Sequence, residues 1–302
     1  MKISHEFVQF RGIMPHQSEV QMQTISIPRR GGVAIKSWAD ILGVSTNVCI
    51  ILFFYLFEAF YVMPQFLGLF GQLVHFLVTT WIVYNILENL RLCATTLSTV
   101  DSLPPEMQQP MKGEEHLWHF CKICQRNVPP RSWHCNTCDA CILKRDHHCN
   151  FVGNCVGHNN QRYFIWFSFY AAIGSGVALF DNFMLAHKYG VGFFDIVTAN
   201  LIIFNAYMNP GRQDLVIFYR IVIVLAVNIF AVLFPAILFC TQVATVHKNS
   251  VMHDYSDRTY DLGFGNNLAL ILGSRRLWTC LAPTIKSPLP HNGTRWKSKR
   301  AV

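Results

Sequence analysis

Cysteine and histidine residues gather in one short segment of this chain. Seven of its eleven cysteines lie between positions 121 and 155, with histidines among them. The pairs Cys121–Cys124 and Cys135–Cys138 have the spacing Cys-x2-Cys, in which both thiolates can bind one tetrahedral metal ion. The candidate ligands are Cys121, Cys124, His134, Cys135, Cys138, Cys141, His148, Cys149 and Cys155. The interspersed histidines favour zinc over an iron–sulfur cluster.

Counting these ligands leaves two alternatives open. Two closed zinc sites need about eight ligands in total. Seven cysteines and one histidine would fill both sites. Six cysteines and two histidines would also fill them and would leave one thiol free. The spacing alone does not choose between the two sets.

Cys149 differs from the other cysteines in the residues that precede it. It directly follows Asp146-His147-His148. An imidazole can take the proton of a thiol, and a carboxylate can orient that imidazole. The run therefore carries the parts of an activated nucleophile, and it makes Cys149 a candidate for covalent chemistry.

The elements that must position this segment are membrane-spanning helices. Of 302 residues, 52% are hydrophobic and 14% are charged, which is about half the charged fraction of a soluble domain and too apolar for a disordered chain. Four apolar runs are long enough to span a bilayer: residues 41–57 (extending to 63), 59–87, 163–180 and 221–246. A fifth stretch, 191–208, contains several polar residues and is expected to form an interfacial or luminal loop segment, with a fifth span as the alternative.

The distribution of Lys and Arg predicts the orientation. Residues 1–40 hold five, residues 88–162 hold eight and the tail after 246 holds nine, whereas residues 188–214 hold two. Basic residues collect on the cytosolic side of membranes, so both termini and the Cys-rich segment are expected to be cytosolic. The spread of these charges over three segments argues against a nucleic-acid-binding protein despite the net charge of +8. The first 36 residues lack the apolar core of a cleavable signal peptide.

These observations predict an α-helical polytopic membrane protein in seven parts. The parts are a cytosolic N-terminal segment (1–40), transmembrane helices 1 and 2 (41–87), a cytosolic Cys-rich domain (88–162), transmembrane helix 3 (163–187), a luminal loop (188–214), transmembrane helix 4 (215–246) and a cytosolic tail (247–302).

The segment from Cys121 to Asn160 resembles the DHHC protein S-acyltransferases, the integral-membrane palmitoyltransferases. It reads Cys-x2-Cys, Pro-x-Arg-Ser-x-His-Cys, x2-Cys-x2-Cys, x4-Asp-His-His-Cys and x5-Cys-Val-Gly-x2-Asn. The resemblance implies four helices with a small, loop-rich, two-zinc domain between the second and third. It implies one zinc site made by Cys121, Cys124, His134 and Cys141, and another made by Cys135, Cys138, His148 and Cys155. Cys149 is then the nucleophile, His147 the general base and Asp146 its orienting partner.

The resemblance also implies a reaction and its partners. The enzyme would transfer a long-chain acyl group from acyl-CoA, such as palmitoyl-CoA, to cysteines near the membrane in substrate proteins at the cytosolic face. The Golgi or the endoplasmic reticulum is the expected location. Contacts with acyl-CoA are expected from Phe151 and from the basic residues Lys144, Arg145 and Arg162.

Some motifs depart from the family pattern. Asn150-Phe151 stands where the family has Pro-Trp, and residues 251–254 replace its Thr-Thr-x-Glu. The tail keeps Tyr260-Asp261-x-Gly263, and the chain is most similar to a divergent subgroup that includes the human member numbered twenty-four. The alternative interpretation is a catalytically weak or inactive, membrane-anchored zinc-binding adaptor of the same fold.

Overall fold

Four long helices form the membrane part of the molecule. The computed structural model describes residues 37–191, 208 and 213–299. Within these residues the long helices are α1 (Trp38–Phe57), α2 (Leu69–Thr95), α3 (Gln161–Lys188) and α6 (Gln213–Lys248), and α1 continues through η1 (Glu58–Val62) and η2 (Met63–Gln65). Each is long and apolar enough to cross a membrane, which confirms the predicted four-span architecture. Nearly all of the fifth stretch lies outside the described residues.

The helix ends follow local sequence signals. A capping box starts α1, in which Asp40 N–H donates to Ser37 Oγ and Ser37 N–H donates to the Asp40 carboxylate. Pro64 lies at the start of η2, where a proline is tolerated, and Gly68 is the N-cap residue of α2. The helices α2, α3 and α6 run several residues beyond the apolar runs, because a helix does not have to stop where the hydrocarbon layer stops.

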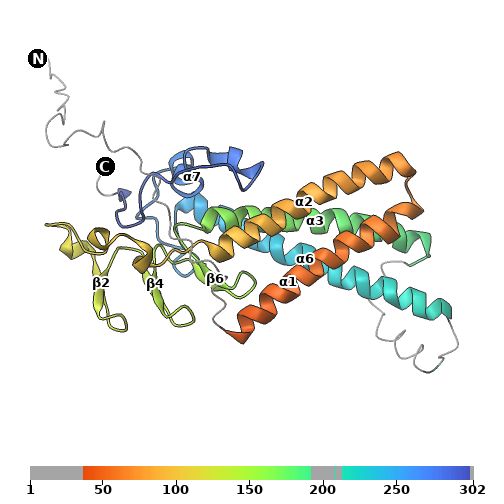
Figure 1. The fold of residues 1–302 in the computed structure, drawn as a ribbon, viewed down its shortest axis with the longest axis horizontal. Helices are drawn as coiled ribbons and strands as arrows, with labels where there is room; N and C mark the ends of the chain where they lie inside the picture. Colours follow the sequence, from red (N-terminus) through yellow and green to blue (C-terminus); the bar gives the residue numbers. More distant parts are fainter. Residues whose placement is uncertain (1–36, 192–207, 209–212, 300–302) are drawn as a thin grey trace, which may run out of the picture.

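The Cys-rich segment folds into three antiparallel two-stranded hairpins. They pair β1 (His119–Cys121) with β2 (Arg126–Val128), β3 (Trp133–Cys135) with β4 (Ala140–Ile142), and β5 (His147–Cys149) with β6 (Asn154–Val156). The segment between α2 and the first hairpin contains three short helical turns: η3 (Val100–Ser102), η4 (Pro105–Met107) and η5 (Glu115–Leu117). Figure 1 shows all three hairpins at one end of the helix bundle.

The three hairpins repeat one local structure every 14 residues. Cys121, Cys135 and Cys149 each end the first strand of a hairpin. In each hairpin the fourth residue after that cysteine has a positive φ: 51° at Gln125, 47° at Asp139 and 69° at Gly153. The sequence therefore builds three equivalent turns, although only the first two contain a second cysteine.

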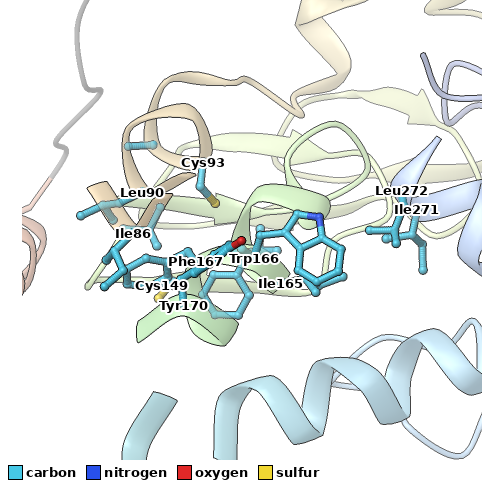
Figure 2. Close-up of a cluster of buried hydrophobic side chains, with 14 of the residues drawn as sticks. Ile86, Leu90, Cys93, Cys149, Ile165, Trp166, Phe167, Tyr170, Ile271 and Leu272 are labelled. Atoms are coloured by element: carbon cyan, nitrogen blue, oxygen red, sulfur yellow. The ribbon is translucent and has the colours of Figure 1, made fainter. Parts of the chain in front are cut away.

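A buried core joins the third hairpin to the helices. Cys149, Val152 and Val156 pack with residues from the end of α2 and the start of α3, and with Ile271 and Leu272 of α7 (Phe264–Leu272) (Figure 2). Beyond α7 the chain forms η6 (Arg276–Cys280) and returns to the hairpin end of the molecule (Figure 1).

Two buried asparagines tie the end of α2 to this hairpin. Asn154 Nδ2 donates to the carbonyl oxygens of Cys93, Ala94 and Thr96, and Asn160 Nδ2 also donates to Cys93 O. The last carbonyls of a helix have no partner within that helix, so these amides satisfy them. The third hairpin is thereby held against the cytosolic end of the bundle that the sequence predicts.

Candidate active site and metal centres

The structure brings the candidate ligands together as two separate groups. One group is Cys121, Cys124, His134 and Cys141, and the other is Cys135, Cys138, His148 and Cys155. Within each group the ligand atoms all lie within 4.8 Å of one another. Three thiols and one imidazole in a compact group suit tetrahedral zinc, and all eleven cysteines are free of disulfides. Of the two ligand counts, this geometry selects six cysteines and two histidines.

Strand register explains why the two groups interleave. The first two ligands of each group come from the turn of one hairpin, and the other two face each other across the next hairpin. His134 is paired with Cys141, and His148 is paired with Cys155. Each metal would therefore fasten one hairpin to the following one.

The second group has a buried partner on α1. His148 Nε2 lies 2.9 Å from Asp40 Oδ1, and the Asp40 side chain is fully buried. A carboxylate on the far nitrogen of a ligating histidine fixes the orientation of the ring. This contact links the metal-binding segment to the first turn of the first membrane helix.

Cys149 belongs to neither group and lies next to the two residues predicted to activate it. His147 and Cys149 are two positions apart on strand β5, so their side chains share one face, whereas His148 points to the opposite face. His147 Nδ1 lies 3.0 Å from Asp146 Oδ2, and Cys149 is close enough to the ring to contribute to the raised pKa of His147. The Phe164 ring packs edge-on against the imidazole with 5.0 Å between ring centroids.

The charges of this trio stabilise one another. Burial favours neutral His147, but hydrogen bonds and charges from Asp146 and Cys149 outweigh it and raise the pKa of His147 to about 9. Burial likewise opposes ionisation of Asp146, yet hydrogen bonds from His147, the Met252 N–H and the Gln242 amide hold its pKa below the ordinary value. The geometry thus supports an imidazolium paired with a carboxylate beside the Cys149 sulfur.

Cys149 also opens onto a large apolar cavity between the four long helices. The cavity contains about 1140 Å³ of space between atoms, part of it open to the surroundings. Phe151 lies beside Cys149 in the lining, and its ring is 5.0 Å from that of Phe234. Along α3 the lining residues run from Phe167 to Asp181, about 21 Å at the helical rise of about 1.5 Å per residue.

The far end of this cavity is polar. Glu58 and Asp181 both line it and are buried. Asn182 Nδ2 donates to Glu58 Oε1 at 2.6 Å, and His75 Nε2 lies 2.9 Å from Asp181 Oδ2. The cavity therefore runs from a thiol at one end to paired polar groups at the other.

The four residues predicted to contact acyl-CoA have different surroundings. Phe151 is at the cavity as expected. Arg162 is half-buried and donates to Ser287 O, and Arg145 is also half-buried. Lys144 is only 1% exposed and donates from Nζ to Gln161 Oε1 at 2.7 Å. The contacts of these residues with CoA stay predictions, and for Lys144 the structure gives other partners.

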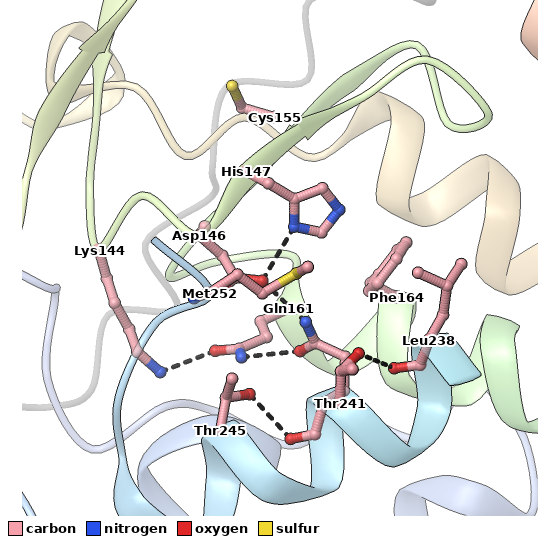
Figure 3. Close-up of polar contacts among 12 residues, drawn as sticks. Lys144, Asp146, His147, Cys155, Gln161, Phe164, Leu238, Thr241, Thr245 and Met252 are labelled. Carbon is pink, nitrogen blue, oxygen red and sulfur yellow. Dashed lines mark hydrogen bonds and ion pairs between the residues drawn. The ribbon is translucent and has the colours of Figure 1, made fainter. Parts of the chain in front are cut away.

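Sequence reasoning missed Asp40, Gln161 and Gln242. Asp40 meets His148 across 108 positions of the chain. The two glutamines are buried and bonded to each other, and Gln242 also bonds Asp146 (Figure 3). The available signal was weak: an acidic residue in a capping box, and one of the two side-chain amides inside the mostly apolar run 221–246.

Four membrane helices, two Cys3His groups and a free thiol at the head of an apolar cavity define a polytopic membrane protein built for thiol chemistry. A family model described as DHHC palmitoyltransferase matches residues 114–258. The protein named "Probable palmitoyltransferase ZDHHC24" is 32% identical over 196 residues in rat and 33% in human, in each case covering 63% of this chain and 68% of the relative. Palmitoyltransferase PFA4 of Debaryomyces hansenii is 51% identical over 78 residues, which cover 26% of this chain and 19% of that protein.

The chain belongs to the DHHC palmitoyltransferase family. It is an integral, multi-pass membrane enzyme of the protein S-palmitoyltransferase class. The similarity to the subgroup of the human member numbered twenty-four is confirmed, and an inactive adaptor is not favoured.

Proposed function

We propose that this enzyme transfers a long-chain acyl group from acyl-CoA to cysteines of substrate proteins through an acyl-Cys149 intermediate. One observation carries the proposal: Cys149 lies on the same strand face as His147, which is paired with Asp146, and Cys149 also lines the apolar cavity. A nucleophile needs the first contact, and an acyl chain needs the second. Acyl-CoA is the co-substrate.

The proposed reaction has two steps. His147 Nε2 holds the proton of Cys149 while the thiolate attacks the thioester carbon of acyl-CoA. The new C–S bond forms as the bond to CoA breaks, and CoA leaves with the proton. In the second step His147 takes a proton from the substrate cysteine, whose sulfur attacks acyl-Cys149 and regenerates the thiol. Asp146 holds the ring so that Nε2 stays directed at sulfur.

Zinc in both groups is proposed to be structural. The residues that would hold it are Cys121, Cys124, His134 and Cys141 in one site, and Cys135, Cys138, His148 and Cys155 in the other. Four protein ligands close each site, so bound zinc would supply folding energy to the short hairpins. The folded hairpins then hold Cys149 beside the membrane.

The depth of the cavity supports a long acyl chain. One leaflet of the bilayer contributes about half of its roughly 30 Å hydrocarbon thickness, and this is the space that a long acyl chain fills in a lipid. The lining along α3 is at least as long. The Cys-rich hairpins are proposed to face the cytosol of the Golgi or endoplasmic reticulum, where cysteines of substrate proteins lie close to the membrane.

The test compares purified full-length protein with its Cys149→Ser variant. Both are incubated with a labelled acyl-CoA, and metal content is measured on both. The expected result is a hydroxylamine-sensitive label on the wild type, no label on the variant, and about two zinc ions in each. Loss of zinc from Cys149→Ser would make Cys149 a metal ligand, and it would overturn the proposal, as would an unlabelled wild type.

A further inference from the structure

Lys144 carries a buried amino group that the proposed chemistry does not use. Its side chain is enclosed, with the Trp296 ring of the C-terminal tail 5.8 Å from Nζ. It hydrogen-bonds Gln161 rather than an acidic residue. Enclosing a lysine this way carries a cost in free energy, so its contacts call for an explanation.

Lys144 stands at one end of a continuous chain of hydrogen bonds (Figure 3). Its Nζ donates to Gln161 Oε1 at 2.7 Å, and Gln161 Nε2 donates to Gln242 Oε1 at 3.0 Å. Gln242 Nε2 then donates to Asp146 Oδ2 at 2.7 Å. Both glutamines and Asp146 are at most 2% exposed. The chain thus links the hairpins, α3 and α6 within a space shielded from water.

The two ends of this chain fix its direction. An ionised carboxylate accepts hydrogen bonds and cannot donate them, so Gln242 must present its NH2 group to Asp146. Its carbonyl oxygen must then accept from Gln161, and the Gln161 carbonyl must accept from Lys144, whose Nζ can donate in either protonation state. Turning either amide around would set two acceptors or two donors against each other. With Lys144 in place, one arrangement satisfies every member.

We call Lys144, Gln161 and Gln242 the relay. It ends on Asp146, the carboxylate that holds His147. Asp146 Oδ2 receives both the Gln242 amide and His147 Nδ1, while Oδ1 accepts from the Met252 backbone N–H at 2.7 Å. Both oxygens are therefore fixed by groups from α6 and the segment just after it. The Met252 contact uses only backbone, so it survives the replacement of the family's Thr-Thr-x-Glu here.

We propose that Lys144, Gln161 and Gln242 are positioning residues that orient Asp146, and through it His147, toward Cys149. This proposal rests on the proposed function, because Asp146, His147 and Cys149 form the site that the three residues orient. It gives Lys144 a role different from the predicted contact with CoA. A change at Lys144 would therefore alter the position of Asp146 through the two glutamines between them, and with it the geometry around Cys149.

The first test separates positioning from CoA binding. Gln242→Leu, Lys144→Met and Gln161→Leu are each expected to lower the rate constant of Cys149 acylation about tenfold to a hundredfold, the range for losing a hydrogen bond to a charged group. The KM for acyl-CoA should stay unchanged. Thr245→Val removes another buried polar group of α6, whose hydroxyl donates to the main-chain O of Gln242 and to none of the side chains in the chain of hydrogen bonds, and it should acylate normally. A raised KM with unchanged rate constant for Lys144→Met would make it a CoA contact and overturn the relay.

The second test asks whether the members act as one chain. Once Gln161→Leu has broken the link, adding Lys144→Met should cost nothing more, so the double variant should match the single one. Independent losses that multiply would overturn the proposal. Zinc content identifies variants that fail to fold. Gln242→Leu, which lies outside the Cys-rich domain, remains decisive if Lys144→Met fails to fold.

A third measurement does not depend on acyl transfer. Alkylation of Cys149 by iodoacetamide, followed by mass spectrometry, reports the reactivity of the thiol that His147 activates. It should slow in Gln242→Leu and stay unchanged in Thr245→Val. If wild type fails to take an acyl label but shows this pattern, the proposed function fails while the relay stands. Equal alkylation of wild type and Gln242→Leu would refute the relay.

Discussion

Gly43 on α1 offers a sharp test of how the nucleophile is held. Asp40, Gly43 and Asn47 lie on one face of this helix and touch the residues on both sides of Cys149. A Cβ added at Gly43 would lie 2.6 Å from Asn150 O and 2.8 Å from its carbonyl carbon. Asn47 Nδ2 donates to Phe151 O at 3.3 Å. We predict that Gly43→Ala impairs acylation of Cys149.

Two opposing effects set the size of this change. Alanine in a helix interior is favoured over glycine by about 0.5–1 kcal/mol, so propensity alone would stabilise the variant. The contact must lengthen from 2.6 Å to an ordinary 3.4 Å, a shift of about 0.8 Å. Overpacking of this kind typically costs about 1–3 kcal/mol, which exceeds the propensity gain. Misplacing a reacting group by about 1 Å can cost about a hundredfold in rate.

The assay is single-turnover acylation with a labelled acyl-CoA, beside zinc content. We expect Gly43→Ala to acylate about ten to a hundred times more slowly with zinc retained. Gly176→Ala is the matched control, because among the described residues no atom lies within 4 Å of its added Cβ and it also sits inside a membrane helix. A Gly43→Ala protein that acylates like wild type would refute the reasoning that this close approach positions Cys149.

Three further predictions test other parts of the site. Asp40→Ala should weaken zinc retention against a chelator about tenfold to a hundredfold, whereas Ser37→Ala, which removes only the helix cap, should not; equal losses in both variants would contradict this. The His147 contribution to stability, about 3 kcal/mol for a pKa raised from 6.5 to about 9, should be complete below about pH 6.5 and vanish as the pH rises through about 9. Thermal unfolding of wild type against His147→Gln across this range measures it, and a difference that grows with pH would contradict it. Ala178→Phe fills space near the polar end of the cavity, so it should slow acylation by a long-chain acyl-CoA more than by a medium-chain one. Equal slowing with both would show that the acyl chain does not reach this part of the cavity.

The sequence was informative wherever function depends on local spacing. Hydropathy predicted the four spans because a bilayer imposes a minimum apolar length on each helix. The Asp146-His147-His148-Cys149 run predicted an activated nucleophile because an imidazole and a carboxylate directly precede the thiol. The structure adds the strand that puts His147 and Cys149 on one face. The ligand count stayed open until cross-strand register grouped the residues, since register depends on hairpin geometry that spacing does not specify.

The missed residues depend on contacts between distant segments. Lys144 was predicted to contact acyl-CoA, and its burial follows only when α3 and the tail close over it. Gln242 is one of several polar residues in a mostly apolar run. Its partner Asp146 is 96 positions away, and no local pattern announces such a pair.

The position of the nucleophile follows from the repeat of hairpins. In the first two hairpins the cysteine that ends the first strand works with a second cysteine three residues later. In the third hairpin that second position holds Val152, which is fully buried in the core shared with the helices. Directly after this hairpin α3 begins at Gln161, where a further hairpin would be needed to supply a facing His–Cys pair. Cys149 thus has the backbone setting of a metal ligand without the partners that would complete a site. The repeat therefore explains why this thiol is left out of both metal-binding groups and lines the cavity that is proposed to take an acyl chain.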